Sequence, residues 1–94
     1  MYIPDSLNIM GHKWAVSYDP HLVADNDNVG EARFLHHKII IQDNLPEEAT
    51  SELLLHEVIE VINQDFELNL EHQAITILGR CLNQVLRDNK IEIR

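Results

Sequence analysis

The sequence predicts an α+β fold in which about four N-terminal strands form a small antiparallel sheet and two C-terminal helices pack on it. Three observations support this fold class. Apolar and polar residues alternate in the first half of the chain, as they do in half-buried strands. The second half repeats apolar residues every three or four positions, as amphipathic helices do. The length of 94 residues fits one small domain, residues 1–94.

The first two strands are expected on either side of a hairpin turn. The segment SLNIMGHKWAVSYDP places Gly11 between two alternating stretches, and Gly11 with His12 predicts the turn. Alternate residues of a strand share one face of the sheet. In the second stretch, the large side chains on one face are Trp14, Val16 and Tyr18.

A loop and two further strands follow. Residues 19–29 are rich in Asp, Asn and Pro, which predicts a loop. Gly30 opens a third stretch, GEARF, and the β-branched run in HKIIIQ predicts the fourth strand. We expect residues 35–37 to turn between them.

The first helix is expected from Pro46 to about Asn63 or Asp65. Proline suits a first helical turn, and Glu47 and Glu48 favour the positive end of the helix dipole. The apolar residues spaced for a core-facing stripe are Leu55, Val58, Ile59 and Ile62.

The second helix is expected between Asn69, a good N-cap residue, and Asn89, a C-terminal stop. Its predicted core-facing stripe consists of Ile75, Leu78, Leu82 and Val85. Cys81, the single cysteine, lies among these residues, so we expect a buried free thiol in a reducing, cytoplasmic setting.

The composition limits the classes of partner. Sixteen acidic and seven basic residues give a formal charge of −9, and the basic residues form no cluster. This argues against nucleic-acid binding and predicts attraction of cations. The N-terminus shows no signal-peptide pattern, and no apolar run approaches the ~20 residues that span a bilayer.

The stretch LLLHEVIEVIN, residues 53–63, carries the main functional signal. Residues i and i+4 share one helix face, so His56 and Glu60 point the same way and are spaced to bind one divalent ion. Glu57 lies beside them, where a general base belongs. An ordinary solvent-exposed polar stripe is the alternative, and its members would be Glu52, His56, Glu60 and Asn63.

This stretch resembles the active-site helix of zincin-like metallopeptidases, in which LLHE leads into HExxH. The chain is similar to the small phage- and prophage-borne members of that group, through GHKWAVSY, IIIQDNLPEEA and LNQVLRDN as well. The resemblance implies a zincin-like domain of a few strands, the motif helix and one closing helix. It also implies a peptidase that uses Zn²⁺.

The resemblance assigns roles residue by residue. His56 matches the first zinc ligand and Glu57 the residue that activates water. Glu60 replaces the second histidine of the motif, and His72 fits the third ligand position on the following helix. The set would then be His56, Glu60 and His72, with the types of two positions exchanged. Glu71 is the rival third ligand.

Three functions follow from these assignments. The first is a zinc-dependent, peptidase-like hydrolase acting on a protein segment laid along a strand edge beside the motif helix. The second is an inactive zincin-like scaffold that binds a protein partner through its acidic surface. The third is a structural zinc site. The partner is expected to be a protein or peptide, with no nucleic acid and no membrane, while the oligomeric state stays open.

The remaining histidines and acids carry weaker signals. His36 and His37 predict either a polar turn or a position near the metal cleft, while His12 and His21 are expected in solvent. Residues 24–28, ADNDN, contain many oxygen ligands but lack the spacing of an EF-hand calcium loop.

Overall fold

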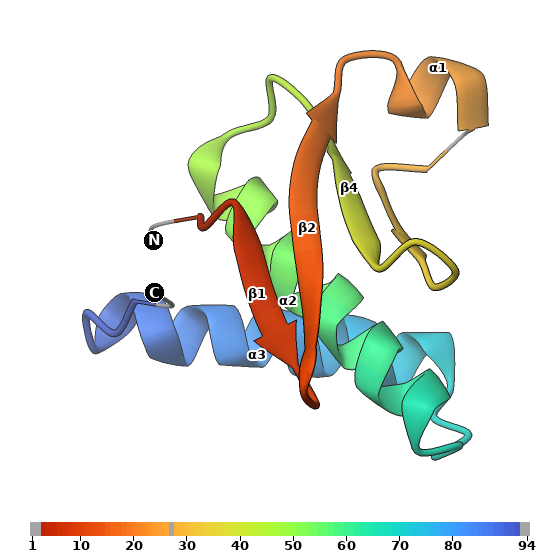
Figure 1. Cartoon of the computed structure of the whole chain (residues 1–94). Coiled ribbons are helices and arrows are strands. Elements are labelled where there is room, and N and C mark those ends of the chain that lie inside the picture. Colours follow the sequence, from red (N-terminus) through yellow and green to blue (C-terminus); the bar gives the residue numbers. More distant parts are fainter. Residues whose placement is uncertain (1–2, 27, 93–94) are drawn as a thin grey trace.

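The computed structural model describes residues 3–26 and 28–92 (Figure 1). Its elements are β1 (Ser6–Ile9), β2 (His12–Asp19), α1 (Leu22–Asn26), β3 (Gly30–Arg33), β4 (Lys38–Gln42), α2 (Glu47–Asp65) and α3 (His72–Asp88). Four strands followed by two packed helices confirm the predicted α+β fold class. Both long helices lie on the same side of the sheet (Figure 1). Within the described residues, no helix combines the length and apolar character needed to cross a bilayer.

The sheet is mixed, with the strand order β1-β2-β4-β3. β1 pairs antiparallel with β2, and β3 pairs antiparallel with β4. The central strands β2 and β4 are parallel, so the expectation of an antiparallel sheet holds only for the two outer pairings. A parallel pair needs a long crossover. Residues 20–37 supply it, because they run through α1 and β3 before β4 returns beside β2.

The hairpin and the acidic loop differ slightly from the prediction. The turn consists of Met10 and Gly11, both with positive φ, so His12 already belongs to β2. Two consecutive residues with positive φ form the type of turn whose twist matches that of paired strands. The predicted loop at residues 19–29 contains the short helix α1, and His21 N–H donates to the Asp19 carboxylate before it (2.8 Å).

The core lies between α2 and the sheet. Leu54 and Val61 of α2 are fully buried, as are Ile39 and Ile41 of β4, and Trp14 of β2 is nearly so. The predicted core stripe of α2 is confirmed in part, because Val58 and Ile62 pack against this core. Of its members, Leu55 is buried, whereas Val58, Ile59 and Ile62 are only partly buried. Because α2 contacts both the sheet and α3, apolar spacing alone does not identify the face that meets the sheet.

The helix α3 begins later than predicted. It starts at His72, and Asn69 lies in the preceding turn with a φ of +59° rather than at the N-cap. The predicted end is confirmed, because Asn89 is the C-cap residue.

The side of α3 that faces the rest of the protein was also predicted wrongly. Ile75 is buried as expected, but the other three stripe members stay 44–45% exposed: Leu78, Leu82 and Val85. Cys81 is exposed too, so the expectation of a buried thiol was wrong. The small and polar residues Gly79 and Asn83 occupy the contact with α2 instead.

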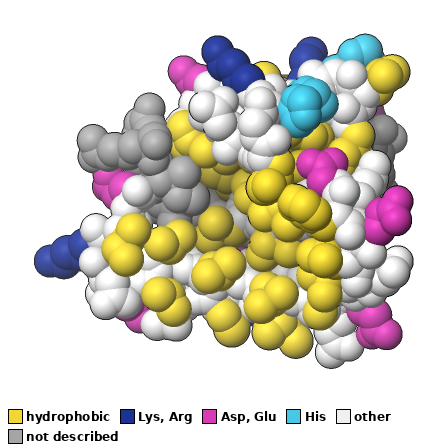
Figure 2. All heavy atoms as spheres, turned by 60° about the horizontal axis from the view of Figure 1, so that its bottom comes forward, with side chains coloured by type: hydrophobic (Ala, Val, Ile, Leu, Met, Phe, Trp, Pro, Cys, Tyr) yellow, Lys and Arg dark blue, Asp and Glu magenta, His cyan; other side chains and the backbone are white. Residues whose placement is uncertain are grey.

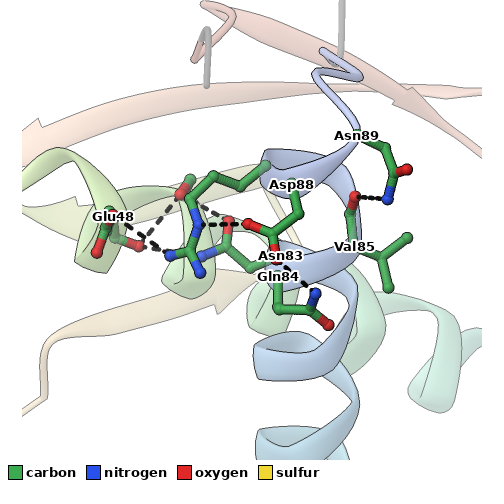
Figure 3. Close-up of polar contacts among 8 residues, drawn as sticks. Glu48, Asn83, Gln84, Val85, Asp88 and Asn89 are labelled. Carbon is green, nitrogen blue, oxygen red and sulfur yellow. Dashed lines mark hydrogen bonds and ion pairs between the residues drawn. The ribbon is translucent and has the colours of Figure 1, made fainter.

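Polar contacts join the start of α2 to the end of α3 (Figure 3). The Ser51 hydroxyl and the buried Asn83 side chain are hydrogen bonded (2.8 Å), and the Asn83 amide donates to the Glu48 carbonyl. Arg87 forms an ion pair with the Glu48 carboxylate (3.3 Å). A buried, satisfied polar pair requires one specific alignment of its partners. These contacts therefore set how α3 lies along α2.

Candidate metal centre

The other end of the helix pair brings three donor side chains together. His56 Nε2 lies 3.6 Å from Glu60 Oε1, and His72 Nδ1 lies 3.7 Å from the same oxygen. One ligand atom of each residue lies within 4.8 Å of the other two. Within residues 3–26 and 28–92, this is the one group of three or more His, Cys, Asp and Glu side chains placed to hold a metal ion.

The spacing fits a tetrahedral metal ion. Ligand bonds of ~2.0–2.1 Å in a tetrahedron place neighbouring donor atoms about 3.4 Å apart. The two distances to Glu60 Oε1 are close to this value. The rings of His56 and His72 meet edge to face with centroids 5.0 Å apart, and all three donor atoms lie within 4.8 Å of one another.

The three donors differ in exposure. The His56 side chain is 14% exposed and that of Glu60 is 32% exposed, whereas that of His72 is 79% exposed. Burial lowers the pKa of His56, although the nearby Glu60 carboxylate opposes this shift. A neutral imidazole is the form that ligates a metal. The group therefore has one partly buried histidine, His56, whose neutral form is favoured by burial, and one histidine, His72, that is open to solvent.

The turn between the helices positions His72 at the start of α3. The Asn63 side chain accepts a hydrogen bond from Leu70 N–H (2.9 Å), which ties the turn back to α2. Glu67 and Asn69 adopt positive φ, so the chain can reverse within a few residues. From the sequence, Asn63 was expected in the alternative polar stripe and Asn69 at a helix cap. Their roles in the turn depend on backbone angles that apolar spacing does not report.

Gly79 allows α3 to approach α2 at His56. A Cβ atom added at Gly79 would lie 3.3 Å from both the backbone N and the Cα of His56. This is tighter than ordinary van der Waals contact, and the neighbouring atoms are helix backbone. The absence of a side chain at position 79 thus sets the distance between the helices where the donors meet.

We expect Gly79→Ala to lower the free energy of unfolding by about 1 kcal/mol. Overpacking costs about 1–3 kcal/mol, against about 1 kcal/mol gained in helix propensity. Urea unfolding monitored by circular dichroism measures the difference. If Gly79→Ala instead raises the free energy of unfolding by about 1 kcal/mol, the value for helix propensity alone, the contact at His56 is not tight.

Glu57 is a buried carboxyl beside the donor group. Its side chain lies under β3, where a Cβ atom added at Gly30 would come 3.2 Å from Glu57 Oε2. Glu57 is only 6% exposed. Burial, followed by the negative charges of Glu60 and Glu31, raises its pKa to about 7. The sequence predicted the position of Glu57 on the helix but not the contact with Gly30, which depends on how the sheet packs.

A cavity of about 420 Å³ opens beside these residues. His56, Glu57 and His72 line it together with Gly30. Apolar side chains complete the opposite parts of its wall, among them Val29 and Leu53. The two histidines of the donor group and the buried carboxyl of Glu57 therefore line one accessible cavity.

The rival residues lie elsewhere. Glu71 is the N-cap residue of α3 and is not part of the donor group found in the described chain. The His37 ring stacks on Trp14 (centroids 4.9 Å apart) and lies 4.9 Å from the His12 ring, and His36 is exposed. The turn prediction for His36 and His37 is thus confirmed, and neither lines the cavity described above.

No protein-family model matches the chain, and comparisons with curated proteins and with solved structures find no match.

Proposed function

We propose that the chain is a zinc-dependent hydrolase of the peptidase type on a zincin-like scaffold. The observation that carries this proposal is the donor group of His56, Glu60 and His72, in which the two histidines line one cavity together with Glu57. Two histidines and one carboxylate, with a fourth position left open, make a catalytic zinc shell. The exposed side of His72 supports an open fourth position, which a structural site would not have.

The residues around the site have complementary roles. Zinc, when bound, would acidify a water molecule and polarise the carbonyl of the substrate. Glu57 follows the first ligand and lines the same cavity, so its carboxylate would accept a proton there and pass it to the leaving amine. Glu57 is buried beside Gly30, where a Cβ atom would come 3.2 Å from its Oε2.

The position of β3 supports an extended peptide as the substrate. β3 is an edge strand, and its first residue, Gly30, lines the cavity. A peptide can pair with a free strand edge through backbone hydrogen bonds while its side chains enter neighbouring pockets. Val29 and Leu53 provide an apolar wall for one such side chain.

Zinc content and affinity test the proposed ligands. Tag-free wild-type protein is expected to bind one zinc ion per chain, measured by elemental analysis and by calorimetric titration. Glu60→Ala and His72→Ala should each weaken binding by more than about 100-fold, because even residues that only support ligands contribute 10- to 100-fold.

Glu71→Ala is the matched control, because it removes a carboxylate next to His72 that is outside the donor group. Its zinc affinity should equal that of the wild type. Normal affinity in His72→Ala would rule out the third ligand. A wild-type protein that binds no zinc would leave the acidic, non-enzymatic scaffold as the better description.

A further inference from the structure

The helix α3 exposes apolar side chains along its length. Figure 2, turned so that the bottom of Figure 1 comes forward, shows hydrophobic side chains gathered over much of this face. The exposed large apolar residues on α3 and just beyond its ends are Phe66, Leu68, Leu70, Ile77, Leu78, Leu82, Val85 and Ile91. All but Leu70 keep between 44% and 54% of their surface exposed. Single apolar residues scattered over a protein surface are normal, but a group of this size indicates an interaction surface.

Four residues in this region form a continuous stripe. Leu78, Cys81, Leu82 and Val85 follow one another at intervals of three, one and three, so they share one side of α3. The residues that meet α2 lie on the adjacent side: Ile75, Gly79 and Asn83. Apolar residues at this spacing form the contact of paired helices. The stripe therefore has the spacing of a helix-pairing surface, and its large members stay half-exposed in the described structure.

Charge favours a second copy of the chain as that partner. The protein has 16 acidic residues, but none lies between residues 72 and 87, where Arg80 and Arg87 are the only charged side chains apart from histidine. Like charges placed opposite one another across an interface oppose association. The body of α3 is thus a surface where two copies of a −9 chain can meet without bringing carboxylates together.

We propose that the chain forms a symmetric dimer in which the α3 helices of two copies pack antiparallel through this stripe. A two-fold axis between residues 81 and 82 places Leu78 of each copy on Val85 of the other. The antiparallel direction also places the two helix dipoles in opposite directions. A two-fold interface uses the same patch on both copies, as this stripe requires.

The size of the surface is appropriate for a dimer. Each partner in a standard protein interface buries about 800 Å². Seven half-exposed large apolar side chains lie on or next to α3, and exposed apolar patches larger than a few hundred Å² mark interaction sites. The cavity residues Gly30, His56 and Glu57 lie on other elements, and His72 lies at the start of α3, outside the stripe. The dimer and the proposed hydrolase can therefore be tested separately.

Sedimentation and a matched pair of variants test the dimer. The wild type should sediment with twice the chain mass of 10.9 kDa, with and without zinc. Leu82→Lys should weaken association by roughly 30-fold or more, because it removes a central apolar contact and places a charge there. Gln84→Lys adds the same charge on the polar side, opposite its hydrogen-bond partner Asp88, and should stay dimeric.

Cys81 provides a second measurement in the unmodified protein. Antiparallel helices whose axes lie 8–10 Å apart bring small residues at their crossing within the Cα distances that a disulfide spans. Diamide oxidation should convert the wild type to a covalent dimer, and Cys81→Ser and Leu82→Lys should both prevent this. A monomeric wild type, a dimer that persists in Leu82→Lys, or a dimer without the Cys81 cross-link would each overturn the proposal.

Discussion

Replacing Glu57 with glutamine is expected to abolish hydrolysis while zinc binding remains intact. The amide has nearly the same shape as the carboxyl group but cannot accept the proton, and a positioned general base contributes about 100- to 10,000-fold to a rate. Glu57 is not one of the three donors, so the affinity for zinc should be unchanged. Its side chain stays under Gly30, so no cavity is created.

A mixture of peptides of varied sequence, followed by mass spectrometry, provides the assay, because it requires no prior choice of substrate. Glu48→Gln is the control, since it neutralises a carboxylate of the same helix that pairs with Arg87 far from the cavity. Its cleavage rate should match the wild type. A Glu57→Gln protein that cleaves at the wild-type rate would remove Glu57 from the mechanism, and zinc binding without cleavage by the wild type would favour a structural metal site.

The metal-free protein is expected to lose stability as the pH rises from about 4.5 to about 7. Burial raises the pKa of Glu57 from 4.5 to about 7, so between these values the folded state holds a proton that the unfolded chain has released. The neutral carboxyl is thus favoured by the fold. Above pH 7 both states are ionised, and a loss on the order of 3 kcal/mol is complete.

Urea unfolding in the presence of a chelator, at about pH 5 and about pH 8, measures this loss. Glu57→Gln isolates it from the titration of the histidines, because the variant lacks only the Glu57 contribution. The variant should be more stable than the wild type at the higher pH, by up to about 3 kcal/mol, and nearly equal to it at the lower pH. Equal differences at both pH values would mean that the buried carboxyl does not keep its proton.

The sequence predicted the helices and strands well because each depends on local patterns. The limits of α2 and the end of α3 at Asn89 follow from capping and apolar spacing. The parallel pairing of β2 and β4 does not, since it depends on the path of residues 20–37 through space. The exposed stripe of Leu78, Leu82 and Val85 was mistaken for core because the same spacing serves a core and a docking surface.

The candidate site could also be predicted from the sequence only where its residues are close together on one helix. His56 and Glu60 are four residues apart on one helix, so their proximity follows from helix geometry alone. The position of His72 was inferred from the family resemblance, and its placement beside Glu60 requires the turn held by Asn63. The surroundings of Glu57 were beyond prediction, because they depend on Gly30, 27 positions earlier in the chain.

The three candidate ligands and Glu57 are held by different elements of the fold, and this has a consequence for partial unfolding. All three donors belong to α2 and α3, a helical hairpin whose contacts are local in sequence, whereas Glu57 owes its burial to β3. Segments of different stability open separately in native proteins. A state in which β3 has detached while the hairpin persists would keep the three candidate ligands together, yet its Glu57 would be hydrated and its pKa would return to the ordinary range. Hydrogen exchange that protects α2 and α3 more than β3 would identify this state.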